Sequence, residues 1–215
     1  MKKFKLTSEF IVDISGVKLF RIKALIEFGN VKAGDLGGYI EKEENLSHMG
    51  DAWVSDDARI SGNAQVFGDA QVFGDAQVFG DAWVFGNARV FGDAWVFGNA
   101  RVSGNAQVFG NARVFGNAWV SGNARVFGDA QVSGNARVSG NARVSGDAQV
   151  FGDARVSGDK DYAYAHGFGS CNRTTTFFRL KDGDVGVRCG CFYGTLRGGC
   201  ERSAGTGKRN GKKGI

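Results

Sequence analysis

A six-residue phrase, repeated without interruption, fills the middle of the chain. From Asp51 to Gly158 the sequence follows [Asp/Asn]-Ala-x-[Val/Ile]-y-Gly, and the pattern lapses once, at Asp56, where glycine is expected. A unit this short cannot bury its apolar side chains by itself, so the repeat describes a structure that grows by stacking. The phrase therefore predicts a solenoid over residues 51–158.

Each unit has the alternation of a β-strand followed by a corner. Alanine and valine face one side and the x and y residues face the other. The Gly-Asp or Gly-Asn pair then turns the chain, because these residues tolerate left-handed backbone conformations. Three units, or 18 residues, would close one triangular coil. The eighteen alanines from Ala52 to Ala154 thus predict an all-β, parallel β-helix of about six coils.

Composition agrees with this architecture. The 215-residue chain contains 35 glycines and no proline, which fits fixed corners and ladders in which every backbone N–H is needed as a donor. No run of about 18 apolar residues occurs, so no transmembrane helix is predicted. The apolar start of the chain is broken by Ser8, Glu9 and Asp13, so we interpret it as mature protein and expect a cytoplasmic location.

The segments on either side of the repeats are expected to cover the open ends of the column. A solenoid exposes unpaired strands and apolar interior at both ends. Residues 1–50 are predicted to form an N-terminal β cap, and residues 159–196 a small β-hairpin module in which "TTTFFRL" and "VGVRCGCF" flank a turn at "KDGD". Residues 197–215 are predicted to be a disordered basic tail.

The repeats resemble those of the left-handed parallel β-helix proteins of the hexapeptide-repeat family, in which an aliphatic residue is followed four positions later by a small one. Val66 with Ala70 and Val90 with Ala94 show this spacing. The resemblance implies a left-handed column; a right-handed, bactofilin-like solenoid is the alternative. Residues 19–47 and 167–196 resemble the flanks of uncharacterised bacterial and prophage-encoded hexapeptide-repeat proteins, which are often described as acyltransferases.

The family resemblance implies that an acyltransferase would use a histidine near the coils and an acyl-CoA held between subunits. Residues 51–158 contain no histidine, cysteine, glutamate or lysine. The weak catalytic candidates are His48, just before the first unit, and His166, just after the last. We expect them to be separated by the length of the column, without a shared site.

No cofactor or metal site is predicted. The four cysteines lack the paired Cys-x-x-Cys spacing of a zinc site, and the corner aspartates alternate freely with asparagines. Half-buried strand thiols are the favoured interpretation of the cysteines, which are Cys171, Cys189, Cys191 and Cys200.

The outward y positions sort into columns when the sequence is folded by eighteens, and two columns are rich in phenylalanine. The rings either stack along the axis and stabilise neighbouring coils, or form apolar stripes that bind a partner. We expect both, with self-association, as a trimer by resemblance, or an unknown protein as the partner. The predicted interaction surface comprises Phe73, Phe91, Phe109, Phe127, Phe79, Phe97, Phe115, Trp83 and Trp95.

Charge gives little reason to expect nucleic acid as a partner. Residues 51–158 carry 8 basic and 10 acidic side chains, a net of −2, and show no sign of a polyanion-binding surface. The basic excess lies after them, where residues 159–215 carry 11 basic and 5 acidic groups. The sequence therefore favours a non-enzymatic scaffold or interaction module, with an acyl-CoA-dependent acyltransferase as the alternative.

Overall fold

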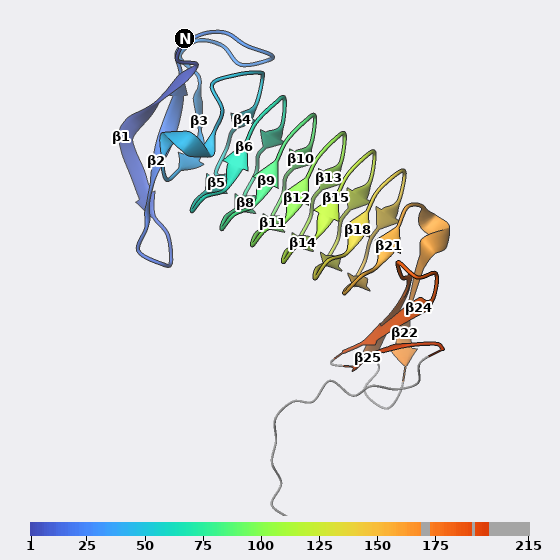
Figure 1. The fold of residues 1–215 in the computed structure, drawn as a ribbon. Coiled ribbons are helices and arrows are strands. Elements are labelled where there is room, and N and C mark those ends of the chain that lie inside the picture. The colour runs from blue at the N-terminus through green and yellow to red at the C-terminus, as the bar shows by residue number, and fades with distance from the viewer. Residues whose placement is uncertain (169–172, 191, 198–215) are drawn as a thin grey trace, which may run out of the picture.

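The computed structural model describes residues 1–168, 173–190 and 192–197, and it confirms the predicted all-β column (Figure 1). Each six-residue unit gives a two-residue strand, made of x and valine, followed by a corner. Each strand pairs in parallel with the strand 18 residues later, as Arg89 with Gln107 and Val90 with Val108. Three units therefore make one coil. The left-handed sense stays a prediction from the resemblance.

The coils stack into three flat faces, each a parallel sheet. The first face contains β4 (Trp53–Val54), β7 (Gln71–Val72), β10 (Arg89–Val90), β13 (Gln107–Val108), β16 (Arg125–Val126) and β19 (Arg143–Val144). The second contains β5 (Arg59–Ile60), β8 (Gln77–Val78), β11 (Trp95–Val96), β14 (Arg113–Val114), β17 (Gln131–Val132) and β20 (Gln149–Val150). The third contains β6 (Gln65–Val66), β9 (Trp83–Val84), β12 (Arg101–Val102), β15 (Trp119–Val120), β18 (Arg137–Val138) and β21 (Arg155–Val156).

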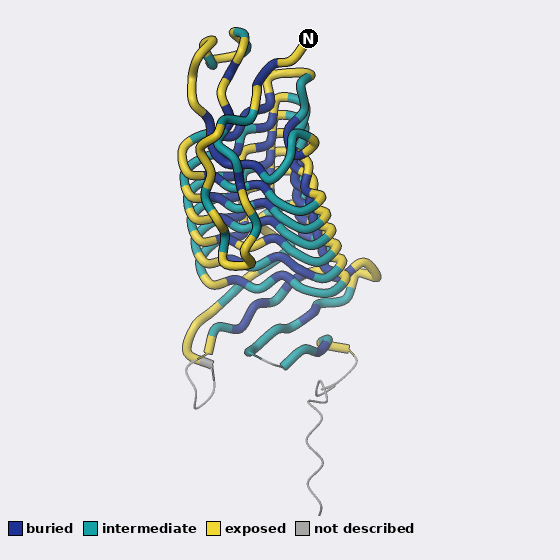
Figure 2. Tube along the Cα trace, turned by 90° about the vertical axis from the view of Figure 1, so that its left-hand side faces the viewer, coloured by how far each residue is buried: buried dark blue, intermediate teal, exposed yellow. Residues whose placement is uncertain are grey.

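The core is a single column of alanine and branched side chains. Every repeat alanine and every repeat valine or isoleucine is buried, with at most 1% of its surface exposed. Figure 2 shows these buried segments recurring on every coil, while the exposed segments lie at the corners. Backbone bonds join the coils along the axis: Arg89 N–H donates to Ala106 O at 2.9 Å, and Phe91 N–H donates to Val108 O at 3.0 Å. Each coil is thus joined to the next both by buried apolar side chains and by backbone hydrogen bonds.

The corners need glycine for two reasons, which Gly86 illustrates. Its φ is 69°, in the left-handed region, and a Cβ there would lie only 3.0 Å from the backbone nitrogen of Gly104 in the next coil. Asp56 is the one non-glycine residue with positive φ among the described residues, at 56°. Its carboxylate accepts the N–H of Gly74 at 3.0 Å, so the side chain takes part in the bonding between coils.

The column begins before the repeat does. The N-terminal segment forms β1 (Phe4–Val12), β2 (Lys18–Ala24) and β3 (Leu36–Ile40), which extend the second face in antiparallel order. β3 then pairs in parallel with β5, Ile40 against Ile60, and Leu46 bridges to Val66. A short 3₁₀ turn, η1 (Glu43–Asn45), lies between these two sides. The column therefore has a seventh, partial coil where about six were expected.

The C-terminal segment closes the other end. After the 3₁₀ turn η2 (Asp159–Asp161), four strands form an antiparallel sheet: β22 (Tyr162–Phe168), β23 (Arg173–Arg179), β24 (Val185–Cys189) and β25 (Phe192–Thr195). β23 and β24 make a hairpin around "KDGD", as predicted, but two further strands enlarge the module. Phe178 and Leu180 join the buried core below the last coil. The predicted tail lies, beyond Arg197, outside the described residues.

The helical content of the described part is limited to η1 and η2. Within the residues that the structure describes, no helix has the length and apolarity needed to span a membrane.

Replacing one corner glycine tests the corner geometry. We expect Gly86→Ala to lower the free energy of unfolding by at least about 1 kcal/mol, because alanine is strained at positive φ and its Cβ would press on Gly104. Urea denaturation followed by circular dichroism measures the change. Gly158→Ala is the control, since Gly158 has φ of −160° and no heavy atom within 4 Å of an added Cβ. Equal losses in the two variants would contradict the argument.

Candidate functional site

His48 belongs to the packing of the N-terminal cap. Its ring stacks on Phe4, with 4.4 Å between the ring centroids. Its Nδ1 accepts the backbone N–H of Lys3 at 3.2 Å, and its Nε2 lies 2.7 Å from Glu43 Oε1. Because Nδ1 accepts a hydrogen bond from the backbone, the neutral ring carries its proton on Nε2, and this N–H donates a hydrogen bond to Glu43. Both nitrogens are therefore engaged in holding the cap together.

His166 lies on β22, at the opposite end of the column (Figure 1). Its Nδ1 is 2.8 Å from Thr174 Oγ1 and 3.7 Å from Asp147 Oδ2. The side chain is 57% exposed, so the ion pair with Asp147 is open to solvent and weak. The structure thus brings neither histidine near the other.

Lys3 is a residue that sequence reasoning missed. Its side chain is almost completely buried, and its Nζ donates to the carbonyls of Gly50 at 3.1 Å and Ala52 at 2.7 Å. Burial lowers the pKa of Lys3 to about 8, although the nearby Asp51 and Asp69 carboxylates act to raise it. The amine thus donates to two carbonyls at the start of the first coil, where no full coil precedes to supply backbone donors.

The side-chain caps at the two ends of the column differ. Along the column, x and y N–H groups donate to alanine and valine carbonyls of the next coil. The first coil therefore has alanine and valine carbonyls without these donors, and the last coil has x and y N–H groups without these acceptors. At the N-terminal end, Asn45 Nδ2 also donates, to Gly62 O and Ala64 O at 3.1 and 2.9 Å. At the C-terminal end the caps are acceptors. These are Asp159 Oδ1 for Arg143 N–H at 3.0 Å, Thr176 Oγ1 for Gln149 N–H at 2.9 Å and Asp161 Oδ2 for Ser157 N–H at 2.8 Å.

The Phe residues at y form stacked ladders along the corners. Phe73, Phe91, Phe109 and Phe127 make the first ladder, with neighbouring ring centroids 4.8 to 5.0 Å apart and ring planes within 3° of parallel. Phe79, Phe97 and Phe115 make the second ladder with the same geometry. Each ring covers a face of the next, so all seven rings are partly buried and present their edges to solvent. The stacking interpretation is confirmed; partner binding by these ladders stays a prediction.

The tryptophans at x are covered in turn by arginines of the following coil. The guanidinium of Arg101 lies 4.9 Å from the ring centroid of Trp83, and that of Arg137 lies 5.6 Å from Trp119. On the second face Arg113 lies 5.1 Å from the ring of Trp95. These cation–π pairs hold the long arginine side chains in defined positions.

Two grooves run along the column beside these x residues. The third-face groove, about 500 Å³, is lined by Asn99, Arg101, Asn117, Trp119, Asn135, Arg137, Asp153, Arg155 and Lys181. The second-face groove, about 620 Å³, is lined by Arg59, Asp75, Gln77, Asp93, Trp95, Asn111, Arg113 and Asp129. The third-face groove has four cations and one carboxylate, a balance of +3; the second-face groove has two cations and three carboxylates, a balance of −1. The fold thus separates charges that nearly cancel in the sequence.

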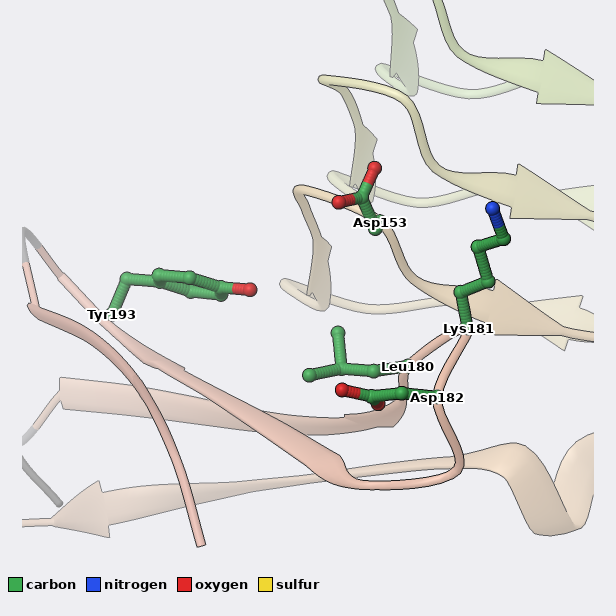
Figure 3. A pocket seen from close by; sticks show the side chains of 5 residues that line it. All are labelled: Asp153, Leu180, Lys181, Asp182 and Tyr193. Carbon is green, nitrogen blue, oxygen red and sulfur yellow. The ribbon is translucent and has the colours of Figure 1, made fainter. Parts of the chain in front are cut away.

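A cavity of about 460 Å³ lies between the last coil and the C-terminal sheet. It is lined by Asp153, Leu180, Lys181, Asp182 and Tyr193, and Figure 3 shows the Tyr193 hydroxyl pointing toward it. Burial raises the pKa of Tyr193, and the carboxylates of Asp153 and Asp182 raise it further. Since Asp153 and Lys181 also line the third-face groove, the groove and the cavity form one continuous concave surface.

The described residues contain no group of three His, Cys, Asp or Glu side chains that could hold a metal ion. Cys189, at the end of β24, is a partly buried free thiol. The other three cysteines, Cys171, Cys191 and Cys200, lie outside the described residues.

Comparison with known proteins identifies the repeat. A family model described as the YdcK beta solenoid repeat matches residues 58–74, 106–122, 118–134 and 130–146. The chain is a β-solenoid repeat protein. The last three matches begin 12 residues apart, which is two sides of a coil, so the similarity lies in the six-residue side and not in one particular face. No curated protein matches this β-solenoid with significance.

The stacking of the first ladder can be measured by removing an inner or an end ring. Phe91 stacks on Phe73 and Phe109, whereas Phe127 has one ring neighbour in the ladder, Phe109. We expect Phe91→Ser to lower the free energy of unfolding about twice as much as Phe127→Ser, since each aromatic pair contributes about 0.5–1.5 kcal/mol beyond area burial. Serine is the residue that the chain itself uses at other y positions. Equal losses in urea denaturation would show that ring stacking is not the cause.

The pH dependence of stability tests the buried amine. Between pH 8 and 10.5 the unfolded chain retains the Lys3 proton that the folded protein has released, so rising pH favours folding. We expect the free energy of unfolding of the wild type, minus that of Lys3→Met, to be level below pH 8 and to rise by more than about 1 kcal/mol up to pH 10.5. Urea titrations at a series of pH values measure it. A difference that stays flat would mean that Lys3 keeps an ordinary pKa.

Proposed function

We propose that this β-solenoid is a non-enzymatic scaffold that presents side chains to a partner at the spacing of its coils. The observation that carries the proposal is the unbroken column: from Ala52 to Val156 every coil has three six-residue sides, and no loop projects from it. Hydrolytic and transfer chemistry needs a nucleophile or base held against other polar groups. The repeat instead gives its outward positions to periodic aromatic, arginine, glutamine and serine side chains.

The division of roles within the six-residue unit supports a binding function. Alanine, valine and the corner glycine provide the core, the ladder and the turn, so x and y vary without disturbing the interior. Side chains on such a column have fixed positions, because the neighbouring coils hold the backbone at every residue. A rigid array of this kind binds at low entropic cost.

We propose a second copy of the chain as the partner of the first and second ladders. The rings leave their edges exposed in straight rows, and Trp95 lies beside the second ladder, with Phe79 and Trp95 in edge contact at 6.1 Å between ring centroids. A second copy carries the same rows at the same coil spacing, so many rings can meet in register. A trimer with parallel axes is the form that the resemblance implies.

Light scattering tests the self-association. We expect light scattering to show an oligomer for the wild type and for Phe67→Ser/Phe85→Ser, a control that removes a stacked pair outside the two ladders. We expect Phe91→Ser/Phe109→Ser to shift it toward the monomer. A wild-type monomer would overturn the association.

Calorimetry with acetyl-CoA tests the non-enzymatic part separately. We expect no binding, since His48 and His166 lie at opposite ends and each has its own local partners. Tight binding, or acyl transfer to an amine or hydroxyl that is lost in His48→Ala or His166→Ala, would support the acyltransferase alternative and overturn the proposal.

A further inference from the structure

We propose that the third-face groove binds a linear acidic polysaccharide, with sugar carboxylates paired to its arginines. Arg101, Arg137 and Arg155 lie on β12, β18 and β21 of this face, with Trp119 on β15 between the first two, and Lys181 adds a fourth cation where the groove meets the end cavity. A single carboxylate, that of Asp153, lies among them, and it accepts a hydrogen bond from Asn135 at 3.2 Å. The groove therefore presents a row of donors with a surplus of positive charge.

Two of the four cations, Arg101 and Arg137, are available and held in place, whereas Arg155 Nη1 already donates to Asn135 O and Ala154 O at 3.1 Å. Within the described chain Arg101, Arg137 and Lys181 form no ion pair. The guanidiniums of Arg101 and Arg137 lie over the rings of Trp83 and Trp119. Trp119 is itself held by a hydrogen bond from its Nε1 to Ser103 Oγ at 3.0 Å. An arginine stacked in this way keeps its planar donor fork for a carboxylate and loses little freedom on binding.

The asparagine column beside the arginines gives the groove its linear repeat. Asn99 Nδ2 donates to Asn117 Oδ1 at 3.2 Å, and Asn117 Nδ2 donates to Asn135 Oδ1 at 3.1 Å. Each amide nitrogen has two hydrogens and uses one in this ladder, so Asn99, Asn117 and Asn135 each keep one for a ligand on three consecutive coils. The coils are about 4.8 Å apart, so these amides form a straight row along the axis. A linear polymer of uronic acids would meet this row of amides beside the arginines.

The same features make single-stranded nucleic acid the less suitable ligand. Nucleic-acid grooves use aromatic faces on which bases stack. Here an arginine covers one face of each of the tryptophans Trp83 and Trp119. The planar groups that remain open are guanidiniums and amides, which suit carboxylates and hydroxyls.

Calorimetry with a purified oligogalacturonate tests the site. We expect binding by the wild type that weakens as salt is added, and at least a tenfold weaker affinity for Arg101→Gln/Arg137→Gln/Lys181→Gln. The matched control removes three cations from the first face, as Arg89→Gln/Arg125→Gln/Arg143→Gln, and should bind like the wild type. Arg101→Lys/Arg137→Lys keeps the charge but removes the fork, and should also weaken binding. Circular dichroism confirms the fold of each variant.

Several outcomes would overturn the proposal. These are no binding of the oligogalacturonate, equal binding of a neutral glucan oligomer, equal loss in the first-face control, or a higher affinity for oligo-dT than for the oligogalacturonate. No phenylalanine of the two ladders lines the groove, and the variants of the two tests share no residue, so an oligomer that does not bind the glycan removes this inference alone. A monomer that binds the glycan removes the proposed self-association alone.

Discussion

The structure depends on a backbone ladder with a period of 18 residues. Each x and y N–H donates to the coil that follows, which fixes the distance between neighbouring coils. Equivalent side chains on neighbouring coils are therefore separated by the same distance along the whole axis. The corner glycines permit this spacing, since a side chain at Gly86 would crowd the next corner. Phe rings, asparagine amides and Arg–Trp pairs all recur at the same interval for this reason.

The direction of these bonds also explains why the two ends of the chain differ. A first coil that exposes carbonyls needs donors, and Lys3 and Asn45 supply them from the N-terminal segment. A last coil that exposes N–H groups needs acceptors, and Asp159, Asp161 and Thr176 supply those. The flanking segments are therefore specific to their ends, although both also cover apolar core.

Much of the architecture could be predicted because the same six-residue pattern occurs eighteen times. Ala-x-Val or Ala-x-Ile marks every side, and the Gly-Asp or Gly-Asn pair marks every corner except the one at Asp56. The extra partial coil could not be read in this way: Ile40 and Leu46 keep the spacing of six but lack the corner signature, and eight residues separate Leu46 from Val54. The capping segments at both ends were predicted, but the capping role of Lys3 was not, since a single lysine gives no periodic signal.

The surface was harder to predict than the core. Charge was counted along the chain, whereas the fold places residues 18 positions apart side by side on one face. Residues 51–158 have a net charge of −2, yet those among them that line the third-face groove have a balance of +2, which Lys181 raises to +3. The arginines of that groove lie among asparagines, whereas the acidic corner residues Asp75, Asp93 and Asp129 line the other groove. The charge of each face can be predicted when the sequence is written in rows of 18 residues. The columns of arginines and corner residues must then be compared as well as those of the phenylalanines.

The outward columns carry a second constraint, which ties the surface to the register of the fold. A slip by one six-residue unit keeps every alanine and valine inside, so the core alone does not choose three units per coil. The outward side chains do: with coils one unit shorter Trp83 would lie against Trp95, and with coils one unit longer against Gln107, in place of Arg101. The Arg–Trp pairs therefore favour three units per coil and belong to the candidate binding surface at the same time. A variant that changes this surface also changes the energy difference between registers.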